Sequence, residues 1–341
     1  MKKLSFINKV IFTINVLVAL LLLMACLCPF VSVSTISFLP FLGLASPVLV
    51  IVNLIFLMYW LLQFKRQFTL SFFVLLLGYF TLGTFIRFGD NSKEELKTDL
   101  TILSYNVRGL NKFEDIESNT VFEDIESLVE NSGADIVCLQ ESANAYTMRS
   151  FDYPHKYASE RPTGEIKTSL SIFSKYPIIK AETLYFPNTV NNACYVDVLV
   201  QNDTIRVYSL HMQSLGITPG SGIIRKSSSQ KLYKKLTSKF EKQEKQASII
   251  AEHSKSVSYK TIICGDFNNN QYSRTYNLIK GNKKDTFDEV GQGYGRTFNF
   301  HRIPVRIDFI LADPRFEVVT HKNFNEVYSD HFPIMASFRL N

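Results

Sequence analysis

The first 87 residues contain no Asp and no Glu, and this pattern limits what the chain can fold into more than any other feature. Six of the 37 Lys and Arg residues lie in this stretch. The other 31 equal in number the 31 acidic residues, all of which come later. The formal net charge of +6 therefore belongs entirely to an apolar first quarter. This excludes a wholly soluble protein. Because the excess positive charge lies on the apolar segment, it is also weak evidence for a nucleic-acid-binding surface.

Three apolar runs in this stretch predict three transmembrane helices. They cover approximately residues 10–31, 38–64 and 68–86. A helix needs about 20 apolar residues to cross the core of a bilayer, with about 17 as the lower limit. The first two runs are long enough, and the third is near that limit. Pro29, Pro40 and Pro47 lie near the ends of the runs or in the link between the first two, where helix breaks are tolerated.

The positive charges around the runs predict an orientation. Lys2, Lys3 and Lys9 precede the first run, Lys65 and Arg66 occupy the second link, and the first link has no charge. The positive-inside rule places the N-terminus and the second link in the cytoplasm. Three crossings then place the rest of the chain outside the cytoplasm. We therefore expect a multi-pass inner (plasma) membrane protein whose C-terminal part is periplasmic or otherwise extracytoplasmic.

Two alternatives concern the first run. It could be a cleaved signal peptide, and residues 23–26 also resemble a lipoprotein cleavage box. In either case the two later runs would still hold the chain in the membrane. Arg87 follows the third run, on the side predicted to be extracytoplasmic, so this single positive charge argues against the predicted orientation.

The sequence divides into a membrane domain (1–88) with three transmembrane helices, a polar linker (89–99) and a C-terminal domain (100–341). A helical pattern precedes the second strand-like run, and another covers about residues 230–255. The five Cys residues have no zinc or disulfide spacing and are expected to be buried thiols. Apolar and β-branched runs predict strands at residues 100–105, 136–139, 170–173, 194–200, 205–210, 261–264 and 307–311.

Polar groups within or directly after these apolar runs, or directly before the apolar residues 332–334, are the candidates for chemistry. Each one alone has an ordinary explanation, such as a turn, a helix cap or a satisfied core histidine. Strand ends of one sheet can converge on a single mouth, which would then hold carboxylates, amides and imidazoles but no thiolate. Such a set suits Mg²⁺ or Mn²⁺ better than zinc. The candidates are Asn106, Glu141, His211, Asp266, Asn268, Asp308, Asp330 and His331.

The motifs that carry these residues, taken in order, resemble the endonuclease/exonuclease/phosphatase superfamily over about residues 100–340. The similarity looks closest to membrane-anchored bacterial members common in Bacteroidetes. It implies a DNase I-like four-layered α/β (α+β) sandwich, with two mixed sheets face to face and helices outside. The motifs are Ser-Tyr-Asn-Val-Arg (104–108), Leu-Gln-Glu (139–141), Ser-Leu-His (209–211), Gly-Asp-Phe-Asn (265–268), Arg-Ile-Asp-Phe-Ile (306–310) and Ser-Asp-His (329–331).

The resemblance also implies roles for these residues. Glu141 would be the main ligand of a Mg²⁺ or Mn²⁺ ion, with Asn106 close to it and Asp330 assisting the metal or the second histidine. Asp266 would orient and deprotonate the attacking water, and Asn268 would hold a phosphate oxygen or the water.

The two histidines complete the implied set. His331 would contact the scissile phosphate, with Asp308 fixing its orientation, and His211 would be the general acid for the leaving group. One departure from the family pattern lies beside the site. Relatives often have Asp-Thr-Pro after the Gly-Asp-Phe-Asn motif, whereas this chain has Asn-Asn-Gln at 269–271.

Together these features predict a membrane-anchored, divalent-metal-dependent phosphoester hydrolase acting on phospholipid headgroups or small phosphorylated compounds. One alternative is a membrane-tethered endo- or exonuclease, although zero net charge after residue 87 argues mildly against tight duplex binding. Another is a membrane protein that only binds phosphorylated ligands. No protein partner is inferable. A basic stretch contains Arg225, Lys226, Lys231, Lys234 and Lys235. It would be either a solvated helix face or a patch that contacts the substrate or the bilayer.

Overall fold

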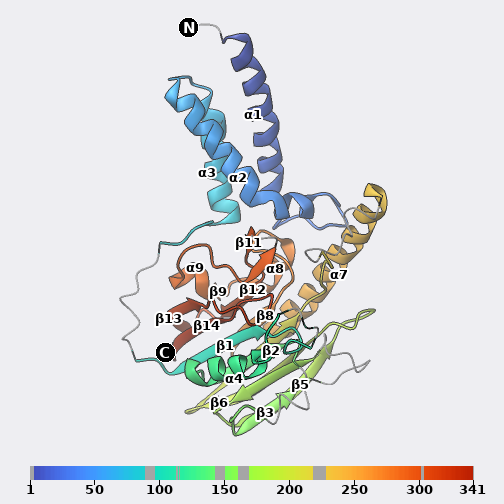
Figure 1. Cartoon of the computed structure of the whole chain (residues 1–341), viewed down its shortest axis with the longest axis vertical. Coiled ribbons are helices and arrows are strands. Elements are labelled where there is room, and N and C mark those ends of the chain that lie inside the picture. The colour runs from blue at the N-terminus through green and yellow to red at the C-terminus, as the bar shows by residue number, and fades with distance from the viewer. Residues whose placement is uncertain are drawn as a thin grey trace.

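The computed structural model describes residues 4–88, 97–112, 114, 116–142, 150–159, 169–217, 228–300 and 303–340. Three helices extend from one side of an α/β domain (Figure 1). The start of α1 and the link between α2 and α3 lie at the end of these helices that is far from the α/β domain (Figure 1).

The N-terminal helices are α1 (Phe6–Ala25), α2 (Leu39–Leu62) and α3 (Phe68–Leu82). By length and composition, α1 and α2 could cross a membrane. The third helix is shorter than the sequence predicts, because Gly83 ends it with a positive φ of 81° that favours glycine. Its 15 residues rise about 22 Å, compared with a bilayer core of about 30 Å. Pro47 lies inside α2, not at its end.

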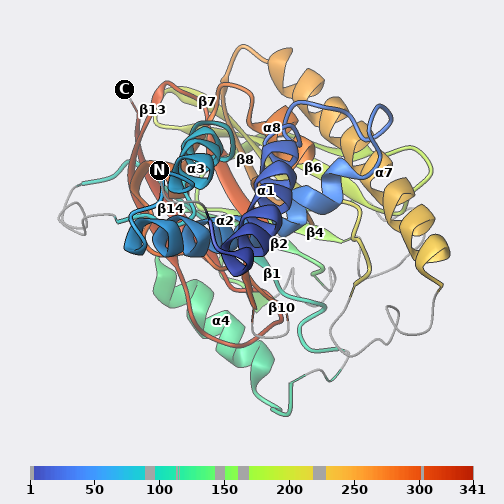
Figure 2. The same ribbon diagram turned by 90° about the horizontal axis from the view of Figure 1, so that it is seen from above.

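A buried polar network joins the three helices. The Asn15 side-chain amide donates to the Ser71 hydroxyl at 2.8 Å, and the Trp60 indole N–H donates to the Asn15 carbonyl oxygen at 2.9 Å. Viewed along their axes, the helices form one compact group over the α/β domain (Figure 2). Interhelical hydrogen bonds of this kind fix the way in which apolar helices pack together.

The C-terminal domain contains two six-stranded mixed sheets. The strand order is β13-β14-β1-β2-β4-β3 in the first sheet and β5-β6-β7-β8-β12-β9 in the second. The first sheet consists of β1 (Leu100–Asn106), β2 (Ile136–Gln140), β3 (His155–Ala158), β4 (Leu170–Ser174), β13 (Phe316–Asn323) and β14 (Ile334–Leu340). The second consists of β5 (Ile178–Tyr185), β6 (Asn192–Val200), β7 (Asp203–His211), β8 (Lys260–Asp266), β9 (Lys284–Asp285) and β12 (Asp308–Ala312).

Helices cover the outer face of each sheet. A buried cluster between the sheets holds inward-facing residues such as Ile102 and Ile262. A second cluster packs α4 (Val121–Ser132) on the first sheet, and a third packs α7 (Ser229–Lys255) and α8 (Arg274–Lys280) on the second. The predicted α/β sandwich with two face-to-face sheets is therefore confirmed. The remaining elements are α9 (Thr286–Val290) and the hairpin of β10 (Phe298–Phe300) and β11 (Ile303–Val305).

All seven predicted strands and both predicted helices are present, with boundaries within a few residues. The five Cys residues are buried free thiols, as the sequence predicts. The predicted linker lies mostly outside the described residues, which resume at residue 97.

Candidate active site

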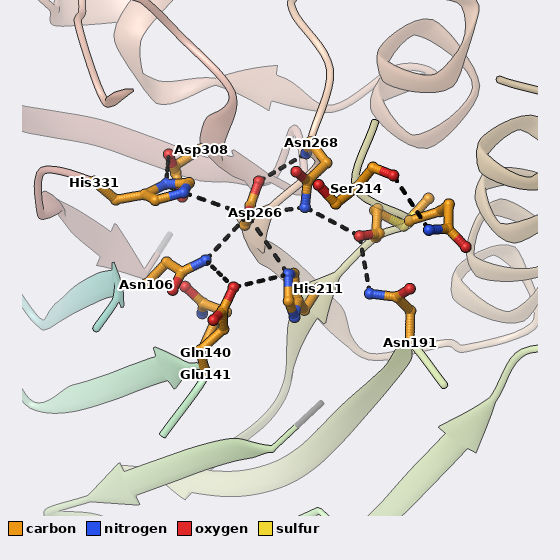
Figure 3. A network of polar contacts seen from close by, with 12 residues as sticks. Asn106, Gln140, Glu141, Asn191, His211, Ser214, Asp266, Asn268, Asp308 and His331 are labelled. Carbon is orange, nitrogen blue, oxygen red and sulfur yellow. Dashed lines mark hydrogen bonds and ion pairs between the residues drawn. The ribbon is translucent and has the colours of Figure 1, made fainter. Parts of the chain in front are cut away.

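Parallel pairing in both sheets brings the candidate residues to one edge (Figure 3). In the first sheet β1 and β2 run parallel, so Asn106 lies opposite Gln140 at their carboxyl ends. In the second sheet β7 and β8 run parallel, so His211 lies opposite Asp266. Asp308, at the start of β12, is also opposite Asp266. The two sheets therefore deliver their polar strand ends to a shared site.

Asp266 is the most heavily hydrogen-bonded carboxylate of the site. Its Oδ1 accepts from the Asn268 backbone N–H at 2.7 Å. Its Oδ2 accepts from the side-chain amides of Asn268 at 2.9 Å and Asn106 at 3.1 Å. Burial raises the pKa of Asp266 to about 6, although the neighbouring His331 cation opposes this rise. The carboxylate is thus held in one orientation and is ionised at neutral pH, as a general base requires.

His331 lies between two carboxylates. Its Nδ1 is 2.9 Å from Asp308 Oδ2, and its Nε2 is 3.7 Å from Asp266 Oδ2. Burial alone would lower the pKa of His331, but these two carboxylates outweigh it and raise the pKa to about 10. The Thr297 hydroxyl accepts from the Asp308 backbone N–H and fixes the start of β12. The structure therefore holds a buried imidazolium, which can neutralise a phosphate oxygen.

Glu141 and His211 have unsatisfied atoms. Glu141 adopts φ of 50°, and its Oε1 is 3.5 Å from Asn106 Nδ2 and 3.6 Å from His211 Nε2. Among the described residues, the buried Glu141 Oε2 and His211 Nδ1 have no hydrogen-bond partner. A buried carboxylate oxygen without a partner is costly unless something else compensates its charge. Together with the Asn106 amide, this oxygen fits a hard divalent cation.

A second group could also offer metal ligands. Asp266, Asp308 and His331 have one ligand atom each within 4.8 Å of one another. These atoms already pair with each other, however. The unpaired Glu141 oxygen is therefore the better match to a metal than this group.

The remaining predicted residues lie at the edge of the site or beyond it. Asp330 forms an ion pair with Arg108 at 2.8 Å. Lys231, Lys234 and Lys235 are exposed on the first turns of α7, and Arg225 and Lys226 lie outside the described residues.

Sequence reasoning missed two supporting glutamines. Gln140 lies within a recognised motif without a predicted role, and its amide donates to the Ser209 hydroxyl at 3.1 Å, which links the two sheets. Gln243 of α7 donates to the backbone carbonyls of Gln213 at 2.7 Å and Asn268 at 3.0 Å. The sequence signal for Gln243 is an uncharged position within a charged helix, and the structure shows that this position is buried.

This fold and this set of side chains define a class of phosphoester hydrolases with a DNase I-like sandwich. Residues 103–331 match the model of the endonuclease/exonuclease/phosphatase family, and the chain belongs to this family. Residues 8–85 match a second model, which is described only as a domain of unknown function. None of the curated proteins matches the chain.

Several solved structures share the fold. An endonuclease/exonuclease/phosphatase from Bacteroides vulgatus is 19% identical with a TM-score of 0.55, over 72% of this chain and 100% of that one. A mannosyl-6-phosphatase from Bacteroides thetaiotaomicron is 18% identical with a TM-score of 0.54, over 70% of this chain and 99% of that one. D. rerio TDP2, complexed with a single-strand DNA product, is 17% identical with a TM-score of 0.54, over 70% and 98%. At these identities the likeness establishes the fold.

Proposed function

We propose that this protein is a membrane-anchored, Mg²⁺- or Mn²⁺-dependent phosphoester hydrolase with an extracytoplasmic catalytic domain. One observation carries the proposal: a fully hydrogen-bonded Asp266 and a cationic His331 lie next to a buried Glu141 oxygen that has no partner. These are a base, a phosphate-binding cation and a metal ligand within one site. Two solved structures of the same fold come from Bacteroides, and we propose that this chain is of the membrane-anchored type, common in Bacteroidetes, that its motifs resemble.

In the proposed mechanism, Asp266 takes a proton from the attacking water. The amides of Asn106 and Asn268 keep its carboxylate aligned, so the water is held in line with the phosphorus. His331, oriented by Asp308, neutralises charge that builds on the phosphate oxygens. Asn268 would hold a phosphate oxygen, and Asp330 would assist through its position beside His331.

His211 would donate a proton to the leaving oxygen. Its Nε2 lies 3.6 Å from Glu141 and 3.7 Å from Asp266, within reach of the same substrate atoms. Glu141 and Asn106 would hold the divalent ion, which when bound polarises the phosphoryl oxygens.

We further propose that all three N-terminal helices cross the membrane. The Asn8 amide donates to the Gln63 side chain at 2.9 Å, so the start of α1 and the end of α2 lie together, far from the C-terminal domain (Figure 1). Lys9, Lys65 and Arg66 are near this end, which the positive-inside rule places in the cytoplasm. A C-terminal tag should be accessible to protease only from the extracytoplasmic side, and a cytoplasmic tag would overturn this topology.

A phospholipid headgroup or a small phosphorylated compound is the proposed substrate, because tethering keeps a lipid substrate local. The exposed Lys231, Lys234 and Lys235 would contact anionic headgroups or substrate. The full chain in detergent would be given Mg²⁺ with either phospholipid vesicles or plasmid DNA, with a chelator and Asp266→Asn as controls. Chelator-sensitive headgroup release supports the lipid assignment, and cutting of DNA alone supports a tethered nuclease. If the wild-type protein carries out neither reaction, both the lipid assignment and the nuclease assignment are rejected.

A further inference from the structure

The loop that follows the catalytic Asn268 is seated on the N-terminal helices. The buried Asn270 side-chain amide donates to the backbone carbonyl of Gly43 in α2 at 3.1 Å. Two residues later, the Tyr272 ring stacks on Phe85 with 4.8 Å between centroids. Tyr272 belongs to the same buried apolar cluster as Leu22 of α1 and Leu82 of α3. A catalytic loop thus contributes a side chain to the core of the helical bundle.

Helix α7 makes a second contact with the same helices. Phe41 of α2 stacks on Tyr233 at 5.2 Å and meets Phe240 edge-on at 5.4 Å. The Glu244 carboxylate accepts from the Val33 backbone N–H at 2.9 Å and from the Ser32 hydroxyl at 2.7 Å. The start of α2 and the preceding loop therefore form a surface against which α7 is fixed. We call this segment, residues 28–46, the platform.

Hydrogen bonds connect the platform contacts to the catalytic groups. Next to Asn270, the Asn269 amide donates to Gln243 of α7 at 2.8 Å. Gln243 in turn donates to the carbonyls of Asn268 and Gln213. The Asn268 amide donates to Asp266 and also to the Met212 carbonyl at 3.0 Å. This series of contacts runs from α2 to the Asp266 carboxylate and to the loop after His211. Each step in it is either a hydrogen bond or a link between residues adjacent in the chain.

Apolar packing reinforces this series of contacts. The residues after His211 continue to Leu215 and Ile217, which pack on a buried cluster of Val33, Leu236 and Phe240, and Phe41 packs on the same cluster. The loop that follows His211 and the loop that contains Asn268 therefore both rest on the platform. Removing the platform would leave a buried amide and several apolar side chains without partners, so both loops would relax.

We infer that the platform positions the catalytic loops, so that the N-terminal helices are a part of the active-site structure as well as an anchor. Asn270 is the central positioning residue of this arrangement. The inference rests on the proposed function of the site.

The test compares two platform variants with a matched control in the full chain in lipid nanodiscs. Asn270→Asp keeps the oxygen that accepts from the Tyr272 backbone N–H but removes the donor to Gly43. Phe41→Ala removes the aromatic contact from the α2 side. Phe73→Ala is the same change at a 63% exposed position of α3, away from the platform. Hydrolysis of bis(p-nitrophenyl) phosphate with Mg²⁺ gives kcat and KM, and hydrogen exchange gives the protection of residues 211–217 and 266–273.

We expect both platform variants to lose about tenfold in kcat with little change in KM, because loop misplacement affects the alignment of the base more than binding. Their exchange should increase at 211–217 and 266–268, whereas Phe73→Ala should match the wild type in both measurements. Unchanged kcat and unchanged exchange in the platform variants would overturn the inference, as would exchange changes confined to residues 28–46. If the wild type shows no hydrolysis but the exchange pattern holds, the positioning stands and the proposed function fails.

Discussion

The two halves of the site differ in how completely their polar atoms are paired. In the paired half, the side chains of Asp266, Asn268, Asp308 and His331 bond to one another. In the open half, Glu141 and His211 each bury an atom that has no partner among the described residues. The paired half is organised before any ligand arrives. The open half is electrostatically incomplete, and in the proposed mechanism a divalent cation would compensate the Glu141 oxygen.

The largest effect should follow from Asp266→Asn, which removes the proposed base but keeps its size. We expect turnover to fall about 10³-fold or more, since the amide cannot accept the proton from water. Phosphoester hydrolysis by the full chain measures this loss, and an unchanged thermal unfolding midpoint shows that the fold is intact. Retained activity would remove Asp266 from the mechanism.

Glu141→Gln tests the open half. This change removes the charge of the carboxylate whose Oε2 has no partner among the described residues, so the Mg²⁺ concentration for half-maximal activity should rise about 10–100-fold. Titration of activity with Mg²⁺ and of binding with Mn²⁺ by calorimetry would show the shift. The same variant should not lower the unfolding midpoint, because it relieves a buried, unpaired carboxylate. A Mg²⁺ dependence equal to that of the wild type would place the metal elsewhere.

Asp308→Asn tests the paired half through pH. Asp308 helps to raise the pKa of His331 to about 10, so without this carboxylate the pKa falls and the imidazolium is lost at a lower pH. We expect kcat at pH 8 to fall about 10–100-fold, with a smaller loss at pH 6, where His331 can still be protonated. The Mg²⁺ dependence should stay that of the wild type. An equal loss at both pH values would mean that Asp308 does not act through the charge of His331.

The smallest effect on activity is expected at His321. This residue is a control, because it tests whether a buried atom without a partner by itself indicates a place in the catalytic site. Its buried Nε2 also lacks a partner among the described residues, but it lies outside the site, with Nδ1 2.8 Å from the Thr286 hydroxyl. Burial lowers the pKa of His321 to about 4, so the folded protein binds fewer protons than the unfolded chain between about pH 4 and 6.5. The contribution of His321 to stability should therefore fall by about 2 kcal/mol as pH drops through this window, while the raised pKa of Asp266 acts in the opposite direction.

His321→Gln should flatten this pH dependence in thermal unfolding and leave hydrolysis unchanged. If His321→Gln altered the Mg²⁺ dependence of hydrolysis, the response to Mg²⁺ would not be confined to the open half of the site. The comparison between the two halves would then fail.

The fold was predictable where strands are buried on both faces. Strands such as β2 and β8 lie between a helix layer and the other sheet, so their sequences are continuous apolar runs. Strands β3 and β5 were missed because they are edge strands with partly exposed side chains, and their mixed polarity gives no clear run. The end of α3 depends on one glycine conformation, which hydropathy does not report.

The site was predictable as far as the motifs reach. Asn106, Glu141, His211 and Asp266 follow or end strands, so the parallel pairings that bring them together could be anticipated. The pairing of Asp330 with Arg108 depends on a side-chain geometry that no spacing encodes. The contact between Asn270 and Gly43 joins residues 227 apart in the chain, so neither local pattern contains it.

The packing of Tyr272 among the N-terminal helices also has a consequence for the assembly of the protein after its synthesis. These helices are synthesised first, and on the proposed topology the C-terminal domain must reach the other side of the membrane before it can meet them. Its sheets can form before that meeting, but the loop carrying Tyr272 cannot complete its packing. A newly exported domain would therefore remain latent until it docks, and activity would report complete assembly, not just a folded domain.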